Sequence, residues 1–267
     1  MANQIHPSAL VSANANLDNV VVGPFAVIED GVEISSGSEI RAGAVIRSRT
    51  IIGKDNVIGE HAVIGGDPQD IHFDKNKKTG VRIGDRNTIR ELSTIHRATV
   101  EGGMTSVGND NFLMAVSHLA HDVKVHNHVI ICNNSLLAGF VEVFDRAFIS
   151  GNCAIHQFVR IGRFVMIAGI TKLPQDAPPF ALIEGYPGQY RTINSLGLKR
   201  GGVRGKERDA IKHYYKVVYE YANIRDALTE LSKLDLNEYG REMVEFISSS
   251  KRGILSSYGK NSQTPSE

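Results

Sequence analysis

A cluster of histidines near the middle of the sequence holds most of the side chains that could do acid–base chemistry. The segment SHLAHDVKVHNH contains His118, His121, His126 and His128, and Asp122 directly follows His121. An imidazole titrates near neutral pH, and an adjacent carboxylate can fix its tautomer. These residues could serve as a general base, as metal ligands or as a solvated surface. The choice depends on where the backbone directs each ring.

The backbone pattern is a repeat of six residues. An aliphatic residue recurs with this spacing, and a small or β-branched residue often follows it four places later. The aliphatic series is Val22, Ile28, Ile34, Ile40, Ile46, Ile52, Ile58, Ile64, Ile83, Ile89, Ile95, Val107, Leu113, Leu119, Val125, Ile131, Leu137, Val143, Ile149, Ile155, Ile161, Ile167 and Leu173. A period of six fits neither an α-helix nor simple strand alternation. It predicts a left-handed parallel β-helix, in which three short strands close a triangular coil of about 18 residues and the aliphatic residue faces inward.

Two segments interrupt the repeat. Residues 65–80 are polar and contain a proline, and residues 101–106 keep the count but place Glu101 where an aliphatic residue belongs. We expect both to be loops at a corner of the β-helix, because loops that leave a solenoid on one side usually mark its binding face.

The composition changes after Leu173, where prolines cluster, and from about Lys206 the apolar spacing becomes helical. We expect residues 1–187 to form the β-helix, residues 188–257 to form a small α-helical domain, and residues 258–267 to be a flexible tail. Asn223 is a candidate N-cap for one of the helices.

The hexads also predict where the histidines point. In each hexad the first residue faces inward and the third faces outward, so His121 should project from a flat face. One coil of about 18 residues places Gly139 above His121, and Gln157 above Gly139. A base, an exposed backbone amide and an amide side chain in one column would suit acyl transfer. Three more histidines fall within a few coils: His96, His118 and His156. We expect His126 and His128 to be solvated.

Composition excludes several classes of protein. The net charge of +1 argues against binding nucleic acid with the whole surface. No apolar stretch approaches the length of a membrane span, and the first residues do not resemble a secretory signal. Cys132 and Cys153 have the neighbours of small buried residues rather than of metal ligands. We therefore expect a cytoplasmic protein that has no stable membrane insertion and no metal site.

Several motifs resemble one enzyme family. "IHRATV", "NFLMAVSHLAHDVKV", "NNSLLAG", "AIHQF" and "QDAPPF", followed by "INSLGLKR", are similar to the acyl-[acyl-carrier-protein]–UDP-N-acetylglucosamine O-acyltransferases of lipid A biosynthesis. The resemblance covers nearly the whole chain. A related N-acyltransferase carries an additional N-terminal domain, and we expect none here. The resemblance implies a homotrimer with active sites between neighbouring β-helices. It also implies transfer of a 3-hydroxyacyl chain to the 3-position of the glucosamine ring of UDP-N-acetylglucosamine, the first step of lipid A biosynthesis.

The resemblance also implies roles for individual residues. His121 would be the general base, Asp122 its orienting partner, and the backbone NH of Gly139 the oxyanion donor. The implied contacts to the sugar nucleotide are Asp70, His72, His96, His118, His156, Gln157, Asn194 and Arg200. Gly169 and Lys172 would line the acyl-chain groove. No cofactor is implied, since the acyl donor arrives on the phosphopantetheine of acyl carrier protein.

A basic segment is the candidate docking surface for that acidic carrier. Residues 199–216 contain seven basic side chains and two acidic ones, and electrostatic complementarity favours such an encounter. The candidate docking residues are Lys199, Arg204, Lys206, Arg208 and Lys212.

Four positions depart from the family pattern. Phe140 stands where a histidine follows "LAG" in well-known members, and His72 falls near the place of a loop lysine, in a loop that is one residue longer. Leu196 and Gly201 replace a glutamate and a second arginine of the nucleotide segment. These changes leave the base and the oxyanion donor intact and alter the contacts expected to the sugar and the uridine.

Four alternatives stay open at the level of the sequence. The acceptor could be a 3-amino UDP-sugar, or the chain could be a hexapeptide acetyltransferase that uses acetyl-CoA. Acetyl-CoA enzymes usually lack a C-terminal helical region as long and basic as this one. A trimeric zinc carbonic anhydrase would need about one zinc per subunit. A purely structural β-helix would not require an outward histidine cluster.

Overall fold

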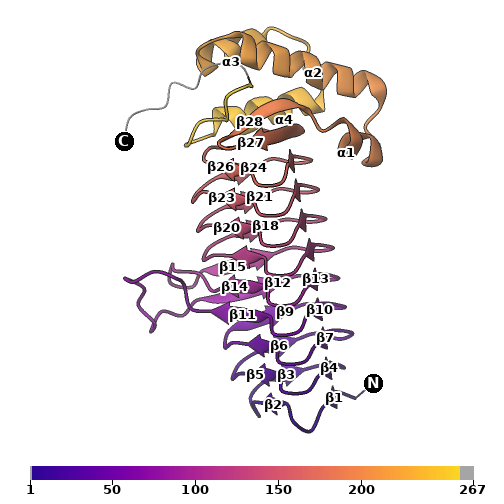
Figure 1. Ribbon diagram of the computed structural model, residues 1–267, viewed down its shortest axis with the longest axis vertical. Coiled ribbons are helices and arrows are strands. Elements are labelled where there is room, and N and C mark those ends of the chain that lie inside the picture. The colour runs from indigo at the N-terminus through magenta and orange to yellow at the C-terminus, as the bar shows by residue number, and fades with distance from the viewer. Residues whose placement is uncertain (1, 259–267) are drawn as a thin grey trace.

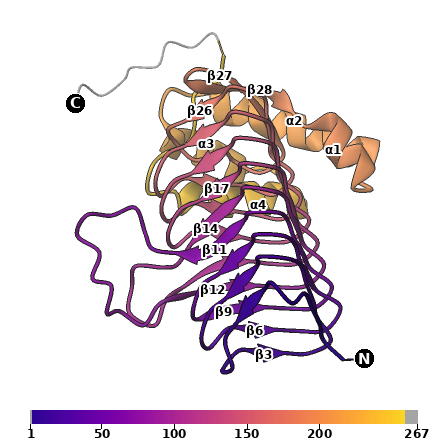
Figure 2. The same ribbon diagram turned by 60° about the horizontal axis from the view of Figure 1, so that its bottom comes forward.

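The computed structural model describes residues 2–258, and the chain forms the left-handed parallel β-helix that the six-residue repeat predicts. Three sheets make the faces of a triangular prism, and the C-terminal helices lie across one end of it (Figure 1). Figure 2 looks into the coils and shows the three-sided outline, with one long loop projecting from a corner.

The strands visit the three faces in turn. The first face contains β1 (Gln4–Ile5), β4 (Val21–Val22), β7 (Glu39–Ile40), β10 (Val57–Ile58), β13 (Thr88–Ile89), β16 (Phe112–Leu113), β19 (Ile130–Ile131), β22 (Phe148–Ile149), β25 (Met166–Ile167), β27 (Ala181–Gly185) and β28 (Gly188–Ile193). The second face contains β2 (Leu10–Val11), β5 (Val27–Ile28), β8 (Val45–Ile46), β11 (Val63–Gly66), β14 (Thr94–His96), β17 (His118–Leu119), β20 (Leu136–Leu137), β23 (Ala154–Ile155) and β26 (Lys172–Leu173). The third face contains β3 (Asn16–Leu17), β6 (Glu33–Ile34), β9 (Thr50–Ile52), β12 (Gly80–Ile83), β15 (Met104–Val107), β18 (Lys124–Val125), β21 (Glu142–Val143) and β24 (Arg160–Ile161).

The interior is built from the predicted aliphatic columns. Every member of the series from Val22 to Leu173 is buried, with Ile155 the most exposed at 3%. The small residues that follow four places later, such as Ala26 and Ala44, are buried as well. Parallel pairing of each strand with the strand one coil away stacks these columns and removes their apolar surface from water.

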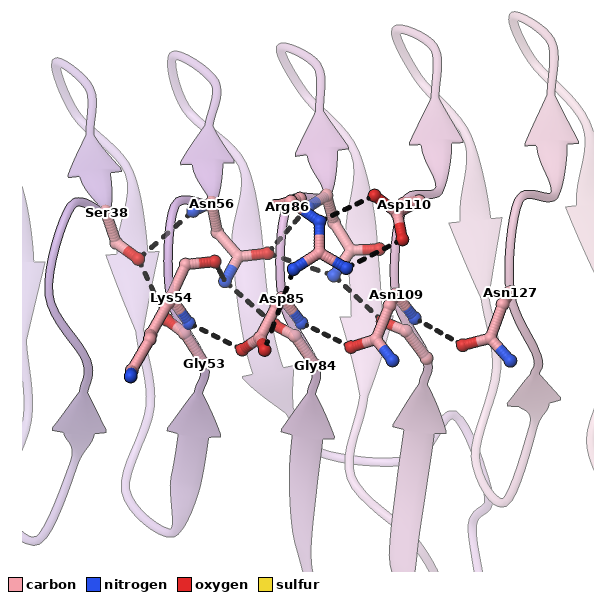
Figure 3. A network of polar contacts seen from close by, with 12 residues as sticks. Ser38, Gly53, Lys54, Asn56, Gly84, Asp85, Arg86, Asn109, Asp110 and Asn127 are labelled. Atoms are coloured by element: carbon pink, nitrogen blue, oxygen red, sulfur yellow. Dashed lines mark hydrogen bonds and ion pairs between the residues drawn. The ribbon is translucent and has the colours of Figure 1, made fainter.

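Buried asparagines close the corner between the third and first faces. The Asn87 side chain donates to Asn56 Oδ1 at 2.9 Å and to the Gly108 carbonyl at 2.9 Å, and it accepts from the Asn111 amide at 2.9 Å. Beside this ladder, the amide of Asp85 donates to Asn109 Oδ1 at 2.7 Å, and the amide of Asn109 donates to Asn127 Oδ1 at 2.9 Å (Figure 3). Backbone groups that the turn leaves unpaired are thus satisfied by the next coil.

Both insertions leave the corner between the second and third faces. Val63 pairs with Thr94, a separation of 31 residues, and Thr94 pairs with His118, a separation of 24, whereas His118 pairs with Leu136 after 18. The longer loop covers residues 67–79, within the predicted range. The smaller insertion covers residues 97–103, earlier than the expected 101–106, because Thr105 is buried and belongs to β15.

The C-terminal region starts with a β-hairpin. β27 and β28 pair antiparallel, so residues 188–193 form a strand beyond the expected boundary at residue 187. The helices are α1 (Ser195–Arg200), α2 (Gly205–Glu220), α3 (Ile224–Ser232) and α4 (Glu238–Ser248). The Asn223 side chain caps α3, as predicted. The hydroxyl of buried Tyr215 on α2 donates to the Pro179 carbonyl at 2.6 Å and so fixes the helices to the β-helix.

The far end of the chain is described only in part. Of the expected tail at 258–267, only Tyr258 lies within the described residues, and the guanidinium of Arg191 lies 3.5 Å from the centre of its ring. Within residues 2–258, none of the helices has the length and apolar character needed to cross a bilayer.

Candidate active site

A groove on the second face collects six of the residues that the sequence singled out: His118, His121, Gly139, His156, Gln157 and Lys172. Its volume is about 510 Å3, and it extends from β17 upward to the hairpin turn at Tyr186. Its lining residues are Gln69, His118, Ala120, His121, Leu136, Leu137, Ala138, Gly139, Ala154, Ile155, His156, Gln157, Lys172 and Tyr186. The stacking of the coils thus brings residues from four consecutive strands of the second face, far apart in the chain, into one surface.

His121 and Asp122 form a hydrogen-bonded pair at the lower end of this groove. His121 Nδ1 lies 2.9 Å from Asp122 Oδ2, and the two side chains are only 15% and 10% exposed. Since a carboxylate accepts, Nδ1 carries the proton and Nε2 is left as the unprotonated nitrogen of the neutral ring. The pair therefore has the tautomer that a general base needs, and His121 is one of the residues that line the groove.

Asp122 is itself held from two directions. Its φ of 61° places it in the left-handed region at the corner, and its amide donates to Thr105 Oγ1 at 2.8 Å. Thr99 donates to Asp122 Oδ2 twice, from its hydroxyl at 2.6 Å and from its amide at 2.9 Å. These donors fix the carboxylate that orients the imidazole.

Gly139 lies directly against the imidazole. A Cβ built on Gly139 would fall 2.4 Å from His121 Cε1 and 2.7 Å from Nε2, so no larger residue fits without moving the ring. The Gly139 amide donates no hydrogen bond within residues 2–258. The corresponding amides of His121 and Gln157 are also unpaired there, but only at Gly139 does the missing side chain let an imidazole lie directly against the backbone.

His96 and His118 pack edge to face beside the dyad, with ring centroids 4.8 Å apart. Burial, with smaller contributions from His118 and His121, lowers the pKa of His96 to about 4. Burial also lowers the pKa of His118, whose Nδ1 lies 2.7 Å from Thr94 Oγ1. Both rings are therefore favoured as neutral species, able to donate and accept hydrogen bonds. His96 Nδ1 is buried with no partner among the described residues.

One outward column forms the floor of the groove. The strand register aligns Thr94, His118, Leu136, Ala154 and Lys172 along the second face. Leu136 and Ala154 make the middle of this column apolar, and the Lys172 ammonium lies 5.7 Å from the centre of the Tyr186 ring at its upper end. The groove is thus polar near the dyad, apolar in the middle and closed by a cation.

His156 and Gln157 lie at the side of the groove. His156 is exposed, and its Nδ1 lies 3.1 Å from the Gln157 carbonyl. Phe140 sits edge-on to His121 with ring centroids 5.4 Å apart, and it stacks on Phe158 at 4.9 Å. Phe140, which departs from the family pattern, therefore contacts His121 through ring packing.

The structure separates other candidate residues from this groove. Asp70 and His72 are exposed on the long loop, where Asp70 Oδ1 accepts from the His72 amide at 2.9 Å. Neither lines the groove, although the preceding residue, Gln69, does. Gly169 lies in the turn before β26 and is also not part of the lining.

Asn194 and Arg200 line a second pocket of about 580 Å3 beneath α1, on the first face. The Asn194 side chain is buried and used inside the protomer, because it accepts from the Gly197 amide at 2.9 Å and donates to the Phe164 carbonyl at 2.9 Å. Leu196 and Gly201 line this pocket too. Within one protomer, Asn194 and Arg200 therefore lie on a different face from His121.

The candidate docking residues surround the start of α2. Lys199, Arg204, Lys206 and Lys212 are exposed, whereas Arg208 is half-buried and donates to the Val203 carbonyl. Arg204 pairs with Glu207 at 2.9 Å, which neutralises part of its charge.

Of the two histidines expected to be solvated, His128 is exposed, and His126 is 39% exposed but also has partners on the surface. Its Nε2 lies 3.1 Å from Glu142 Oε1, and its ring stacks on Phe144 with centroids 4.9 Å apart. The hydrogen bond to Glu142 raises the pKa of His126. Lys124 and Glu142 are register partners on the third face, so His126 belongs to that surface and not to the groove.

The sequence did not predict several residues of the site: Thr94, Thr99, Gln69, Leu136 and Tyr186. The spacing of one coil identifies Leu136 above His118, but the insertions hide the relation of Thr94 and Thr99 to the dyad. No group of three or more His, Cys, Asp or Glu side chains within residues 2–258 could hold a metal ion.

Comparisons with known proteins agree with the fold. A family model described as UDP-N-acetylglucosamine O-acyltransferase, domain 2, matches residues 176–255, and one for six bacterial transferase hexapeptide repeats matches residues 104–139. The acyl-[acyl-carrier-protein]–UDP-N-acetylglucosamine O-acyltransferase of Burkholderia mallei is 40% identical over 198 residues, which are 72% of this chain and 75% of that relative.

Solved structures are similar over almost the whole chain. The UDP-N-acetylglucosamine acyltransferase of Francisella novicida has a TM-score of 0.92 and 35% identity, and the match covers 96% of this chain and 95% of that one. The corresponding enzyme of Bacteroides fragilis has a TM-score of 0.91 and 37% identity, with 94% and 100% covered.

Proposed function

The chain belongs to the family of acyl-[acyl-carrier-protein]–UDP-N-acetylglucosamine O-acyltransferases and is an acyltransferase, and from this premise we propose its reaction. It transfers a 3-hydroxyacyl chain from acyl carrier protein to the 3-position of the glucosamine ring of UDP-N-acetylglucosamine, the first step of lipid A biosynthesis. The observation that carries the proposal is the dyad beneath an open backbone amide: His121 on Asp122 at 2.9 Å, with Gly139 against the ring.

The dyad supplies the base of this reaction. Nε2 of His121 removes the proton of the 3-hydroxyl as its oxygen attacks the thioester carbonyl, and Asp122 stabilises the imidazolium that forms. The imidazolium then returns the proton to the thiolate of the phosphopantetheine as the tetrahedral intermediate collapses. No cofactor is required, because the thioester is already activated.

The amide of Gly139 is the proposed oxyanion donor. Negative charge develops on the thioester oxygen during the attack, and a fixed backbone NH stabilises that charge without reorganisation. The absence of a side chain at Gly139 lets the imidazole lie against this backbone, so that one thioester can reach the amide and the ring together. One such donor typically contributes about 3 kcal/mol to the transition state.

His96, His118, His156 and Gln157 are proposed to contact the acceptor sugar. The neutral state favoured for His96 and His118 suits hydrogen bonds to hydroxyl and amide groups of a sugar. The unpartnered Nδ1 of His96 leaves a buried polar atom for such a ligand.

We propose a homotrimer with the site between neighbours. Asn194 and Arg200 lie on another face from His121, so a nucleotide that reaches both Arg200 and His121 requires two protomers. Asp70 and His72 on the projecting loop are proposed to reach a neighbour in the same way. Exposed apolar side chains line the corner between the first and second faces and support burial in an interface: Phe25, Leu92, Val116 and Ile170.

The apolar column of Leu136 and Ala154 is proposed to take the acyl chain, with Lys172 closing its far end. Gly169 is a more distant candidate for the same groove. The exposed cations Lys199, Arg204, Lys206 and Lys212, with Arg208, are proposed to receive the acidic acyl carrier protein, since complementary charge speeds association and fixes orientation.

A transfer assay tests the proposed function. Purified protein is offered acyl carrier protein loaded with 3-hydroxyacyl chains of several lengths, together with UDP-N-acetylglucosamine or its 3-amino analogue. We expect an ester product and saturation in both substrates. Transfer to the 3-amino sugar alone would replace the acceptor, and transfer from acetyl-CoA but not from the carrier would overturn the proposal.

A further inference from the structure

The short insertion at residues 97–103 contacts the back of the dyad. Thr99 lies in this segment, and both of its donors end on one oxygen of Asp122: Oγ1 at 2.6 Å and the amide at 2.9 Å from Oδ2. The same oxygen accepts from His121 Nδ1 at 2.9 Å. Three donors therefore converge on Oδ2, and two of them come from Thr99.

The same insertion also anchors the long loop. The Arg97 guanidinium binds Asp67 Oδ1 at 2.9 Å and donates to the carbonyls of Lys77 at 3.0 Å and Lys75 at 3.1 Å. Its charge lies 4.8 Å from the centre of the Phe73 ring. Arg97 thus fixes both ends of the loop whose stem carries Gln69, a residue of the groove lining.

One further contact joins the loop to the dyad. Lys77 Nζ donates to the Thr99 carbonyl at 3.0 Å. Hydrogen bonds on both sides of Thr99 therefore connect the Lys77 ammonium, through the covalent structure of Thr99, to the Asp122 carboxylate and on to His121. Charge-assisted bonds of this kind are stronger than neutral ones and hold their partners in a narrower range of positions.

We infer that Thr99 is a positioning residue for the base, and that Lys77 connects its placement to the long loop. This inference rests on the proposed function for its kinetic consequences. Without the Thr99 hydroxyl, Asp122 keeps one donor from Thr99 and can rotate, so His121 spends less time in the reactive tautomer and orientation. Thr99 acts through Asp122 and touches no reacting atom.

Thr99→Val tests the inference most simply, because valine has nearly the same shape and keeps the amide donor. We expect kcat to fall by about 10- to 100-fold, while KM for both substrates stays within about twofold. Thr99→Ser restores a hydroxyl and should recover kcat to within about threefold of wild type. Thr229→Val makes the same exchange at an exposed position on α3 and serves as the control.

Two kinetic results would overturn the inference. The first is a folded Thr99→Val protein whose kcat lies within twofold of wild type. The second is a Thr99→Ser protein as slow as Thr99→Val, because this would indicate that threonine only shapes the insertion.

A spectroscopic readout separates this inference from the proposed function. The Nδ1 proton of His121, held between nitrogen and Asp122, should give a downfield proton resonance in the protein without substrates, assigned by its loss in His121→Ala. We expect Thr99→Val to shift or broaden this resonance, and Thr99→Ser to retain it. If wild type transfers no acyl group but the resonance responds in this way, the proposed function fails and the positioning role stands. A resonance unchanged in Thr99→Val would overturn that role.

Lys77→Met tests the connection to the loop. It removes the ammonium on Thr99 and keeps the length of the side chain, and we expect kcat to fall by about threefold. Lys75→Met is the matched control, since only its backbone carbonyl contacts Arg97. Equal rates for the two variants would overturn the connection to the loop.

Discussion

Two corners of the β-helix have similar backbones but use polar groups in opposite ways. The first joins the third face to the first face, and the second joins the second face to the third face. At the first of these, Asn56, Asn87 and Asn111 direct their amides into the neighbouring coils, where each finds partners (Figure 3 shows part of this ladder). At the second, the Gly139 amide is unpaired within the described chain, and His121 lines the groove. The repeat thus satisfies its polar groups at one corner and leaves them open at the other, where we propose the reactive site.

Exchanges at the two corners should therefore have opposite consequences. Variants at the satisfied corner should lower stability and leave the chemical step intact. Variants at the open corner should lower kcat and leave the fold intact.

Gly139→Ala should give the largest effect at the open corner. The new methyl group would fall 2.4 Å from His121 Cε1, so the ring must move away from its reactive position. We expect kcat to fall by about 10²- to 10³-fold, with an unchanged thermal midpoint of unfolding. Gly151→Ala, whose Cβ would meet only the Asn133 carbonyl at 3.3 Å, is the control. Equal kcat for the two variants would contradict the role given to this corner.

Asn87→Ala should give the largest effect at the satisfied corner. Asn87 is fully buried, and its loss leaves the Asn111 amide and the Gly108 carbonyl without their partners. We expect the free energy of unfolding to fall by about 3 kcal/mol, measured by chemical denaturation, while kcat of the folded fraction is unchanged. Asn134→Ala, at an exposed corner, should cost much less. A loss of activity without a loss of stability in Asn87→Ala would break the comparison.

Lys172→Ala should change which acyl chain is accepted. Lys172 closes the apolar column above Ala154, and its removal opens about one more coil, roughly 4.8 Å of length. We expect kcat/KM for longer acyl chains to rise about tenfold relative to shorter ones, measured with a series of loaded carrier proteins. Lys124→Ala on the third face is the control. An unchanged chain-length profile would place the end of the groove elsewhere.

His126→Gln should give the smallest effect, and one that depends on pH. The Glu142 hydrogen bond raises the pKa of His126, and the His126 hydrogen bond lowers the pKa of Glu142. The stability that His126 contributes is fully present below the ordinary histidine pKa of 6.5 and is lost as pH rises through its raised pKa in the folded protein. The stability that Glu142 contributes is fully present above pH 4.5, its ordinary pKa, and is lost as pH falls through its lowered pKa in the folded protein.

The two side chains are about a third exposed, so solvent screens the pair and its contribution is small. We expect wild type to exceed His126→Gln in stability by about 0.5 kcal/mol near pH 5.5 and by less near pH 8. Unfolding curves at the two pH values measure the difference. A difference that grows with pH would show that the pair is not formed.

Much of the fold can be predicted from the sequence because the six-residue repeat relates residues that are close together in the chain. Aliphatic residues six apart can share an interior only if the chain turns after each short strand, and the coil length then places Gly139 over His121. The position of the smaller loop is harder to predict from the sequence, since its residues keep the six-residue count while the side chain of Thr105 in β15 is buried.

The contacts around the dyad are harder to predict. Thr99 reaches Asp122 because two insertions change the separation between coils from 18 to 31 and 24 residues, and no simple addition along the chain shows this. Asn194 lies in one of the family motifs, but its side-chain amide caps α1 and donates to the Phe164 carbonyl. The contact with Phe164 depends on tertiary packing. The pairing of His126 with Glu142 likewise arises between neighbouring coils.

The rate of His121→Ala relative to wild type, measured with carrier-bound 3-hydroxyacyl donor and UDP-N-acetylglucosamine, tests the central claim most directly. Removal of the imidazole should lower turnover by about 10³-fold, with an unchanged thermal midpoint and oligomeric state. A folded His121→Ala protein that kept more than about a tenth of the wild-type rate would show that another group removes the proton.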